Sequence, residues 1–179
     1  TYDKLFNEYN HTVAQVLLTG EDVHSEQRSR NMRNTIFRLL ELGALPVINE
    51  NDTVATDEVG VENTIGENDT LSAIVAAAVH ADLLILLSDI DGLYDGDPHR
   101  DPAAHLIPTV PCLDEHIMAL GGGSGSALGT GGMATKLKAA RIVTEAGCEM
   151  VIANGAKPAL LYDIVAGKPV GTRFMGKEA

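Results

Sequence analysis

The sequence predicts an α/β fold, a three-layer αβα sandwich around a mainly parallel central sheet. Short runs of Val, Ile and Leu alternate with longer segments of helical periodicity, and this alternation is typical of a sheet with helices on both faces. The apolar runs are continuous, as expected of parallel strands buried on both sides. Four of these runs are expected to be strands: VAQVLLT (13–19), PVINE (46–50), DLLILLS (82–88) and EMVIAN (149–154).

Helices are predicted between these strands. Residues 26–43 carry apolar side chains at helical spacing and stop at Gly43. Segment 69–81 is apolar nearly all round, which predicts a helix buried between layers. The opening stretch TYDKLFNEY also has the character of a helix.

A further helix is expected from about Met133. At about 100° per residue, its residues divide between a solvated face and a core stripe. The solvated face is expected to hold Lys138, Arg141 and Glu145, and the core stripe Ala139, Ile142, Val143 and Ala146.

The composition of the chain restricts the classes of protein to which it can belong. The 179 residues, 45% of them hydrophobic, suit a single domain over residues 1–179. A formal charge of −12 argues against nucleic-acid and anionic-membrane partners, and the apolar runs are too short to span a membrane. Cys112 and Cys148 lie far apart without a CxxC spacing, which favours a reduced, cytoplasmic protein. The histidines show no metal-ligand spacing, so no metal ligands are assigned.

Polar residues follow the second predicted strand and precede the helix at 69–81. Asn51–Asp52 and Asn68–Asp69 are expected at one edge of the sheet. Together they would form a pocket for a zwitterion, in which a carboxylate faces an ammonium and amides face a carboxylate. Singly, such residues are also common turn formers, and Asn68 or Asp69 could cap the helix.

The loop SDIDGLYDGDP follows the third predicted strand. It does not have the spacing of an EF-hand calcium loop. Ser88 and Asp89 at the strand's end, with Tyr94 beyond them, suit contacts to a nucleotide, because ligands in α/β sheets collect at the carboxyl ends of strands. Acidic residues with Gly and Pro are equally typical of turns.

A glycine-rich stretch, residues 121–132, leads into the helix that contains Lys136. Glycines before a helix start form anion sites, although the P-loop spelling GxxxxGK[ST] is not met. Lys136 falls on the inner side of its helix, where an ammonium is costly unless an anion meets it. The alternatives are a flexible linker and a lysine that snorkels to solvent.

Six blocks, in order, resemble the amino acid kinase family over essentially the whole chain. They are NENDTVATDE, GENDTLSAI, LLILLSDIDGLYDGDP, GTGGMATKLKAARI, VIANG and VGTRF. Within that family, the NEND and GENDT blocks are similar to those of the members that phosphorylate glutamate. The resemblance places glutamate-site loops at about 46–72 and the nucleotide half at about 82–179. It also implies that the chain lacks the family's amino-terminal segment, so the sandwich would be incomplete at that end.

The resemblance also implies roles for individual residues. Asp52 and Asn68 would bind L-glutamate, and Asp69 would organise the catalytic centre. Ser88 and Asp89 correspond to a nucleotide-binding Thr-Asp pair, and Lys136 would reach toward the transferred phosphoryl group. The loop around the ATP phosphates would comprise Thr130, Gly131, Gly132, Met133, Ala134, Thr135 and Lys136.

The activity implied is ATP-dependent phosphorylation of glutamate to γ-glutamyl phosphate, the first step of proline biosynthesis. ATP and Mg²⁺ would take part, proline would be a feedback inhibitor, and the protein would be a homo-oligomer. Three alternatives remain: another kinase of the family, a catalytically silent binding fragment, and a structural fragment that binds no ligand.

Overall fold

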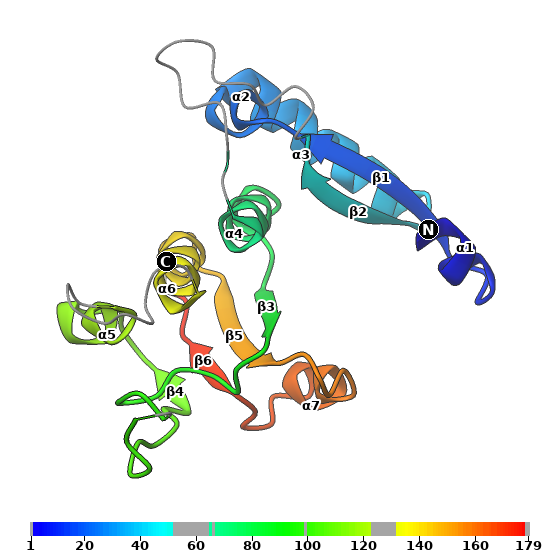
Figure 1. The fold of residues 1–179 in the computed structure, drawn as a ribbon. Helices are drawn as coiled ribbons and strands as arrows, with labels where there is room; N and C mark the ends of the chain where they lie inside the picture. The colour runs from blue at the N-terminus through cyan, green and yellow to red at the C-terminus, as the bar shows by residue number, and fades with distance from the viewer. Residues whose placement is uncertain (1, 52–64, 66, 99, 123–131, 178–179) are drawn as a thin grey trace. The chain divides into compact units, whose positions relative to one another are not determined.

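The computed structural model describes residues 2–51, 65, 67–98, 100–122 and 132–177 (Figure 1). The chain divides into two compact units, Thr1–Leu71 and Ser72–Ala179. The expectation of a single domain over residues 1–179 stays a prediction.

The first unit is built on two parallel strands, β1 (Thr12–Leu18) and β2 (Ala44–Glu50). Their register pairs Thr12 with Ala44 and Leu18 with Glu50, so both strands end at the same edge. Between them lie the short α2 (Gly20–His24) and the long α3 (Glu26–Glu41), and α1 (Tyr2–Asn7) precedes β1. Figure 1 shows α3 running along the β1–β2 pair.

The helix α3 forms where its periodicity predicts it. Met32 and Ile36, one turn apart, are its buried residues. The helix ends at Glu41, and Gly43 follows with φ +72°, a left-handed conformation that glycine adopts without strain. The amides of Leu42 and Gly43 bond back to the carbonyls of Arg38 and Leu40, which satisfies the end of the helix.

The second unit contains a four-stranded sheet in the order β3-β5-β6-β4. β3 pairs with β5 in parallel and β4 pairs with β6 in parallel, whereas β5 and β6 are antiparallel. The strands are β3 (Leu83–Ser88), β4 (Thr109–Val110), β5 (Glu149–Asn154) and β6 (Thr172–Phe174). The helices are α5 (Glu115–Leu120), α6 (Gly132–Glu145) and α7 (Leu160–Val165), and α4 (Asn68–Ala78) begins in the first unit and ends in the second.

Helices cover both faces of this second sheet. Alternate residues of β5 point to opposite sides, as strand geometry requires. Met150 and Ile152 belong to a cluster that also contains buried apolar residues of α4 and α6, whereas Val151 and Ala153 pack with Ile164 of α7. The expected αβα layering is therefore confirmed.

All four strands predicted from the sequence form, with ends within two residues of the predicted ones. β4 and β6 were not predicted, because two- and three-residue strands are too short to show an apolar run. Within the described ranges, no helix is both long and apolar enough to cross a membrane.

Candidate functional site

The carboxyl ends of β3 and β5 bring together the polar residues expected to contact a nucleotide. Ser88 lies opposite Asn154 in the parallel register, and the Gly155 amide donates to the Ser88 carbonyl at 2.7 Å. The Ser88 hydroxyl donates to the Asp89 carboxylate at 3.0 Å. The predicted pair therefore lies at the carboxyl ends of two parallel strands, where ligands of α/β sheets collect.

Asn154 is part of this edge, although the sequence did not mark it as a site residue. Its amide nitrogen donates to Asp91 Oδ1 at 2.9 Å, and its Oδ1 accepts from the Ala156 amide at 2.9 Å. Asn154 thus ties the loop after β3 to the loop after β5. The VIANG block contains it, but spacing alone does not distinguish it from an ordinary turn-forming Asn.

Lys136 is the fifth residue of α6 (Gly132–Glu145), and the helical phase predicts it on the inner side of this helix. Leu137, Ala139, Ala140 and Val143 are completely buried, whereas Lys138 is exposed and Lys136 is half-buried. Lys136 therefore lies between the core side and the solvated side of its helix. One expectation for this helix was wrong: Ala146 is exposed because α6 ends at Glu145, one residue earlier.

The Lys136 side chain bends back over the start of its own helix. Its Nζ donates to the Gly132 carbonyl at 3.3 Å, and the Thr135 hydroxyl donates to the same carbonyl at 3.0 Å. The ammonium therefore sits at the amino end of α6, where the helix dipole is also positive. The ammonium and the positive end of the helix dipole together favour the binding of an anion at this place. Thr130 and Gly131, which complete the predicted phosphate loop, lie outside the described residues.

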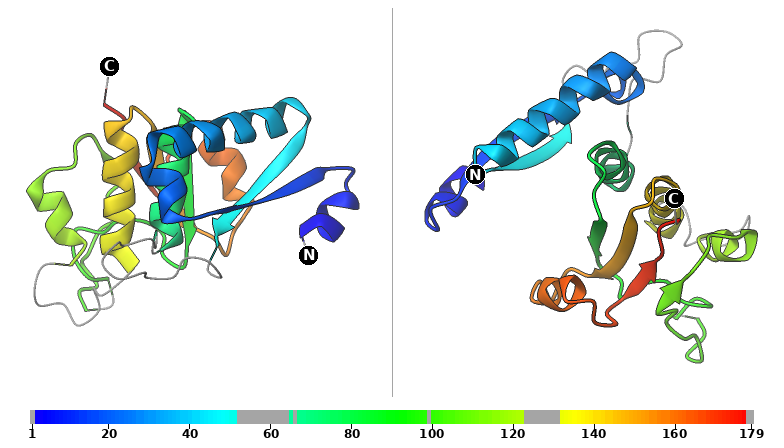
Figure 2. Two further views of the ribbon diagram at one scale, coloured as in Figure 1. Left: turned by 90° about the horizontal axis from the view of Figure 1, so that it is seen from above. Right: turned by 180° about the vertical axis from the view of Figure 1, so that it is seen from behind.

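α6 brings this turn to the edge where β3 and β5 end. Only residues 146–148 separate α6 from β5, so the helix must run back along the sheet, antiparallel to β5. Leu137 and Val143 lie in one core cluster with Met150 and Ile152, which shows that α6 packs along β5. The left view of Figure 2 shows α6 (yellow) lengthwise. The start of α6 and the Ser88–Asp89 pair thus share one edge of the second unit.

In the first unit, Glu50 and Asn51 of the NEND block lie at the carboxyl end of β2, beside the end of β1. The Asn51 amide donates to the Leu18 carbonyl at 2.7 Å. Glu50 Oε1 accepts from the Ile65 amide at 2.6 Å, which links the described residues on the two sides of positions 52–64. Asp52 lies outside the described residues, so its place in a glutamate pocket stays a prediction.

Asn68 and Asp69 lie in the first turn of α4. The amides of Thr70 and Leu71 donate to the carbonyl of Glu67, at 3.0 and 3.1 Å. Because the first helical bonds are accepted by Glu67, the alternative that Asn68 or Asp69 is the N-cap is wrong. The roles proposed for these two side chains remain predictions.

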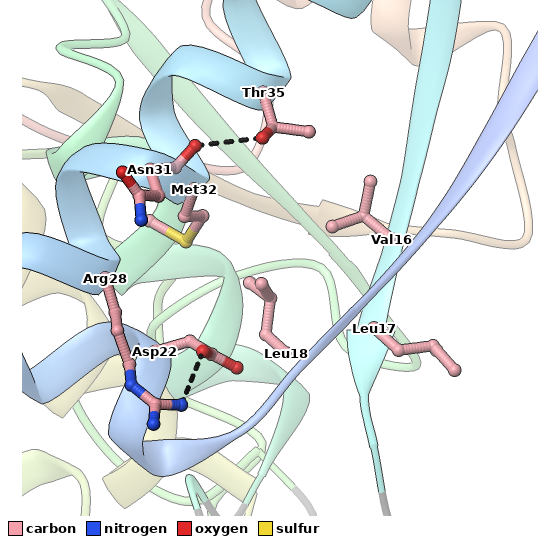
Figure 3. A pocket seen from close by; sticks show the side chains of 8 residues that line it. All are labelled: Val16, Leu17, Leu18, Asp22, Arg28, Asn31, Met32 and Thr35. Atoms are coloured by element: carbon pink, nitrogen blue, oxygen red, sulfur yellow. Dashed lines mark hydrogen bonds and ion pairs between the residues drawn. The ribbon is translucent and has the colours of Figure 1, made fainter.

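A separate cavity of about 210 Å³ lies between β1, α2 and α3 (Figure 3). Arg28 at its wall has a side chain that is 53% exposed, and it pairs with Glu21 at 2.9 Å and with Asp22 at 3.5 Å. None of the predicted site residues that have described positions lines this cavity. Its lining consists of Val16, Leu17, Leu18, Asp22, Arg28, Asn31, Met32 and Thr35.

Asp22 supplies a carboxylate to the lining of this cavity. Its Oδ2 accepts from both the amide and the hydroxyl of Thr19, each at 2.8 Å. Partial burial opposes its ionisation, but the Thr19 hydrogen bonds and Arg28 outweigh burial and hold the pKa of Asp22 below its ordinary value. Asp22 is therefore a charged residue that holds the turn between β1 and α2.

Among the residues with described positions, no group of three or more His, Cys, Asp or Glu side chains is placed to hold a metal ion.

Comparison with known proteins agrees with this geometry. Residues 1–154 match the model of the amino acid kinase family. The chain is 53% identical over 174 residues to glutamate 5-kinase of Clostridium tetani, covering 97% of this chain and 64% of the relative. It is 49% identical to glutamate 5-kinase of Lactiplantibacillus plantarum, covering 97% and 65%. The chain thus spans slightly less than two thirds of the length of these relatives.

Solved structures show the same fold at much lower identity. Carbamate kinase from Giardia lamblia bound to AMP-PNP superposes with a TM-score of 0.66 at 18% identity, covering 98% of this chain and 66% of that one. UMP kinase from Ureaplasma parvum gives 0.61 at 18% identity, covering 96% and 63%. The family model, which matches most of the chain, and this shared fold lead to one conclusion: the chain belongs to the amino acid kinase family.

Proposed function

We propose that this protein is an ATP-dependent kinase that phosphorylates the side-chain carboxylate of L-glutamate, giving γ-glutamyl phosphate and ADP. The observation that carries the proposal is the position of the Lys136 ammonium, at the amino end of α6 and on the edge where β3 ends in Ser88–Asp89. About half of the residues are identical to those of glutamate 5-kinases, which supports glutamate as the acceptor.

The reaction places modest demands on the protein. A glutamate γ-carboxylate is ionised at neutral pH, so no general base is needed to create the nucleophile. One carboxylate oxygen attacks the γ-phosphorus of ATP, the bond to the β–γ bridging oxygen breaks, and ADP leaves with the electron pair. The protein must align these two groups and offset the charge on the phosphoryl oxygens.

The nucleotide half supplies the positive groups. The Lys136 ammonium and the amides of Gly132–Thr135 at the start of α6 would face the phosphates. Ser88 and Asp89, at the end of β3, would contact the rest of the nucleotide. Mg²⁺ bound to the ATP phosphates would neutralise further charge.

The glutamate half supplies selectivity. Asp52 would pair with the α-ammonium of glutamate, and the Asn68 amide would bind a substrate carboxylate. Asp69, in the first turn of α4, would hold cationic groups in place without shuttling a proton. Inhibition by proline and assembly into a homo-oligomer stay predictions that come from the family resemblance.

An acceptor panel tests the proposal. The protein expressed from its complete gene is incubated with Mg·ATP and, one at a time, glutamate, aspartate, acetylglutamate, carbamate and UMP, while ADP release is followed by a coupled assay. We expect ADP release that depends on glutamate. ADP release with another acceptor would indicate a different kinase of the family, and calorimetric binding of ATP without ADP release would indicate a silent binding protein.

A further inference from the structure

Thr172 is a buried polar residue that the proposed mechanism does not use. It begins β6, lies in the VGTRF block, and is completely buried. A buried hydroxyl is almost always hydrogen-bonded, so its partners indicate what it holds in place.

The partners of Thr172 lie in the segment that links β3 to β4. Residues 93–95 and 105–107 of that segment form a short antiparallel ribbon, with Tyr94 bridged to Leu106. The Ile107 amide donates to the Leu93 carbonyl at 2.8 Å, and the Asp95 amide donates to the His105 carbonyl at 3.0 Å. These two stretches together form the 93–107 ribbon.

In an antiparallel pair, hydrogen-bonded residues normally exchange two backbone bonds. Leu93 and Ile107, at the base of the 93–107 ribbon, share one backbone hydrogen bond, and the Thr172 side chain makes the second connection between them. The Leu93 amide donates to Thr172 Oγ1 at 2.8 Å, and the Thr172 hydroxyl donates to the Ile107 carbonyl at 2.7 Å. The hydroxyl therefore uses both its acceptor and its donor capacity to hold the base of the ribbon to β6.

The backbone packs tightly around this hydroxyl. A Cβ added at Gly92 would lie 2.5 Å from Thr172 Oγ1, and one added at Gly171 would lie 2.0 Å from the Ile152 carbonyl and 3.2 Å from that of Asp91. The turn before β6 thus touches β5 on one side and the loop after β3 on the other. A larger residue at either glycine would therefore force this backbone apart.

From this arrangement we infer that Thr172 is a positioning residue of the nucleotide site. Only Asp89–Gly92 separate Ser88, at the end of β3, from Leu93, whose amide Thr172 holds. The Ser88–Asp89 pair is therefore fixed by β3 on one side and by the Thr172 hydroxyl on the other. This inference rests on the proposed nucleotide role of Ser88 and Asp89.

Three variants of the protein expressed from its complete gene test the inference. Thr172→Val keeps the shape of the side chain and removes the hydroxyl, whereas Thr172→Ser keeps the hydroxyl. Asp95→Ala is the matched control, because it removes the bond from the His105 amide to Asp95 Oδ1 (2.7 Å) at the far rung of the same ribbon. The measurements are the Kd of ATP by calorimetry and the KM values for ATP and glutamate.

We expect Thr172→Val to raise the Kd and KM for ATP about tenfold with the KM for glutamate unchanged. Thr172→Ser and Asp95→Ala should retain wild-type ATP affinity. Unchanged ATP affinity in a folded Thr172→Val protein would overturn the inference, as would equal increases in the KM values for ATP and glutamate. If Thr172→Val does not fold, the other two variants decide: a tenfold loss of ATP affinity in either would show that the hydroxyl is not the positioning group.

Failure of the proposed function gives a different result. Wild-type protein that binds ATP but phosphorylates no glutamate would overturn the glutamate kinase proposal alone, and the Kd comparison would still test Thr172. Wild-type protein that binds no ATP would overturn both.

Discussion

At the scale of single residues, Lys136 and Lys138 show how helical phase separates two neighbouring lysines. Lys138 is exposed, whereas Lys136 is half-buried and its Nζ contacts the Gly132 carbonyl at the start of α6. The phase of Lys136 could be predicted from the sequence, because the buried residues around it recur at helical spacing. The backward bend of its side chain could not, because it depends on rotamers.

Replacing Lys136 tests its role in the reaction. We expect Lys136→Ala to lower kcat about a hundredfold or more, as does the removal of other preorganised donors to developing charge. Lys138→Ala, on the solvated side of the same helix, should leave kcat within about twofold of wild type, since surface substitutions away from a site usually have small effects. Wild-type kcat in Lys136→Ala would show that the ammonium does not act on the transferred group.

Replacing Asp52 tests substrate selection. If Asp52 pairs with the α-ammonium of glutamate, Asp52→Ala should raise the KM for glutamate far more than the KM for ATP. Steady-state kinetics with each substrate varied in turn gives both values. Similar increases in the two KM values would contradict a specific role in binding glutamate.

The lowered pKa of Asp22 predicts how the free energy of unfolding depends on pH. Its pKa is lower in the folded protein, so its stabilisation is present above the ordinary carboxyl pKa of about 3.9 and is lost as the pH falls through the folded-state value. We expect Asp22→Ala to lower the free energy of unfolding by about 1 kcal/mol at neutral pH, with a smaller loss near pH 3. Urea unfolding at both pH values measures the difference, and a loss that stays constant with pH would rule out the charged form as the cause.

At the scale of elements, the sequence predicted long periodic segments and missed short ones. β3 and β5 are continuous apolar runs and α3 has a clear apolar stripe, so local pattern is sufficient to find them. β6 is only three residues long, and it forms because β4 and β5 pair with its two edges. Such a strand depends on partners distant in sequence, which local pattern does not contain.

The importance of β6 can be measured through Phe174. This side chain is completely buried in the cluster that includes Val110 and Met150. Phe174→Ala should lower the free energy of unfolding by about 3–5 kcal/mol. Phe37→Ala on α3, where the side chain is 42% exposed, should cost about 1 kcal/mol or less. Similar losses in the two variants would contradict a central place for β6 in the core of the second unit.

The candidate site could be predicted only in part, because some of its residues depend on partners that are distant in the sequence. Ser88 and Asp89 follow a strongly apolar strand, so their place at its carboxyl end could be inferred directly. Asn154 and Thr172 act by hydrogen bonds to the loop after β3, at sequence separations of 63 and 79 residues. Their contributions depend on the sheet order β3-β5-β6, which the sequence pattern does not determine.

At the scale of the whole molecule, charge and function must be reconciled. The chain has a formal charge of −12, which repels a polyanionic nucleotide at long range. Binding ATP would therefore require local positive groups, and in the proposed function the amino end of α6 with Lys136 would provide them in the second unit. The family membership shows the fold, and the phosphorylation of glutamate at this place is the proposal that needs a test.

The most direct test of the central claim is to trap the product. An acyl phosphate reacts with hydroxylamine to give a hydroxamate, whereas a phosphate ester or an unreacted carboxylate does not. The protein expressed from its complete gene is incubated with Mg·ATP, glutamate and hydroxylamine, and hydroxamate and ADP are both measured. We predict γ-glutamyl hydroxamate and ADP in equal amounts, both strongly reduced in Lys136→Ala. ADP release without hydroxamate, or neither product from a folded protein, would contradict phosphorylation of the glutamate side chain.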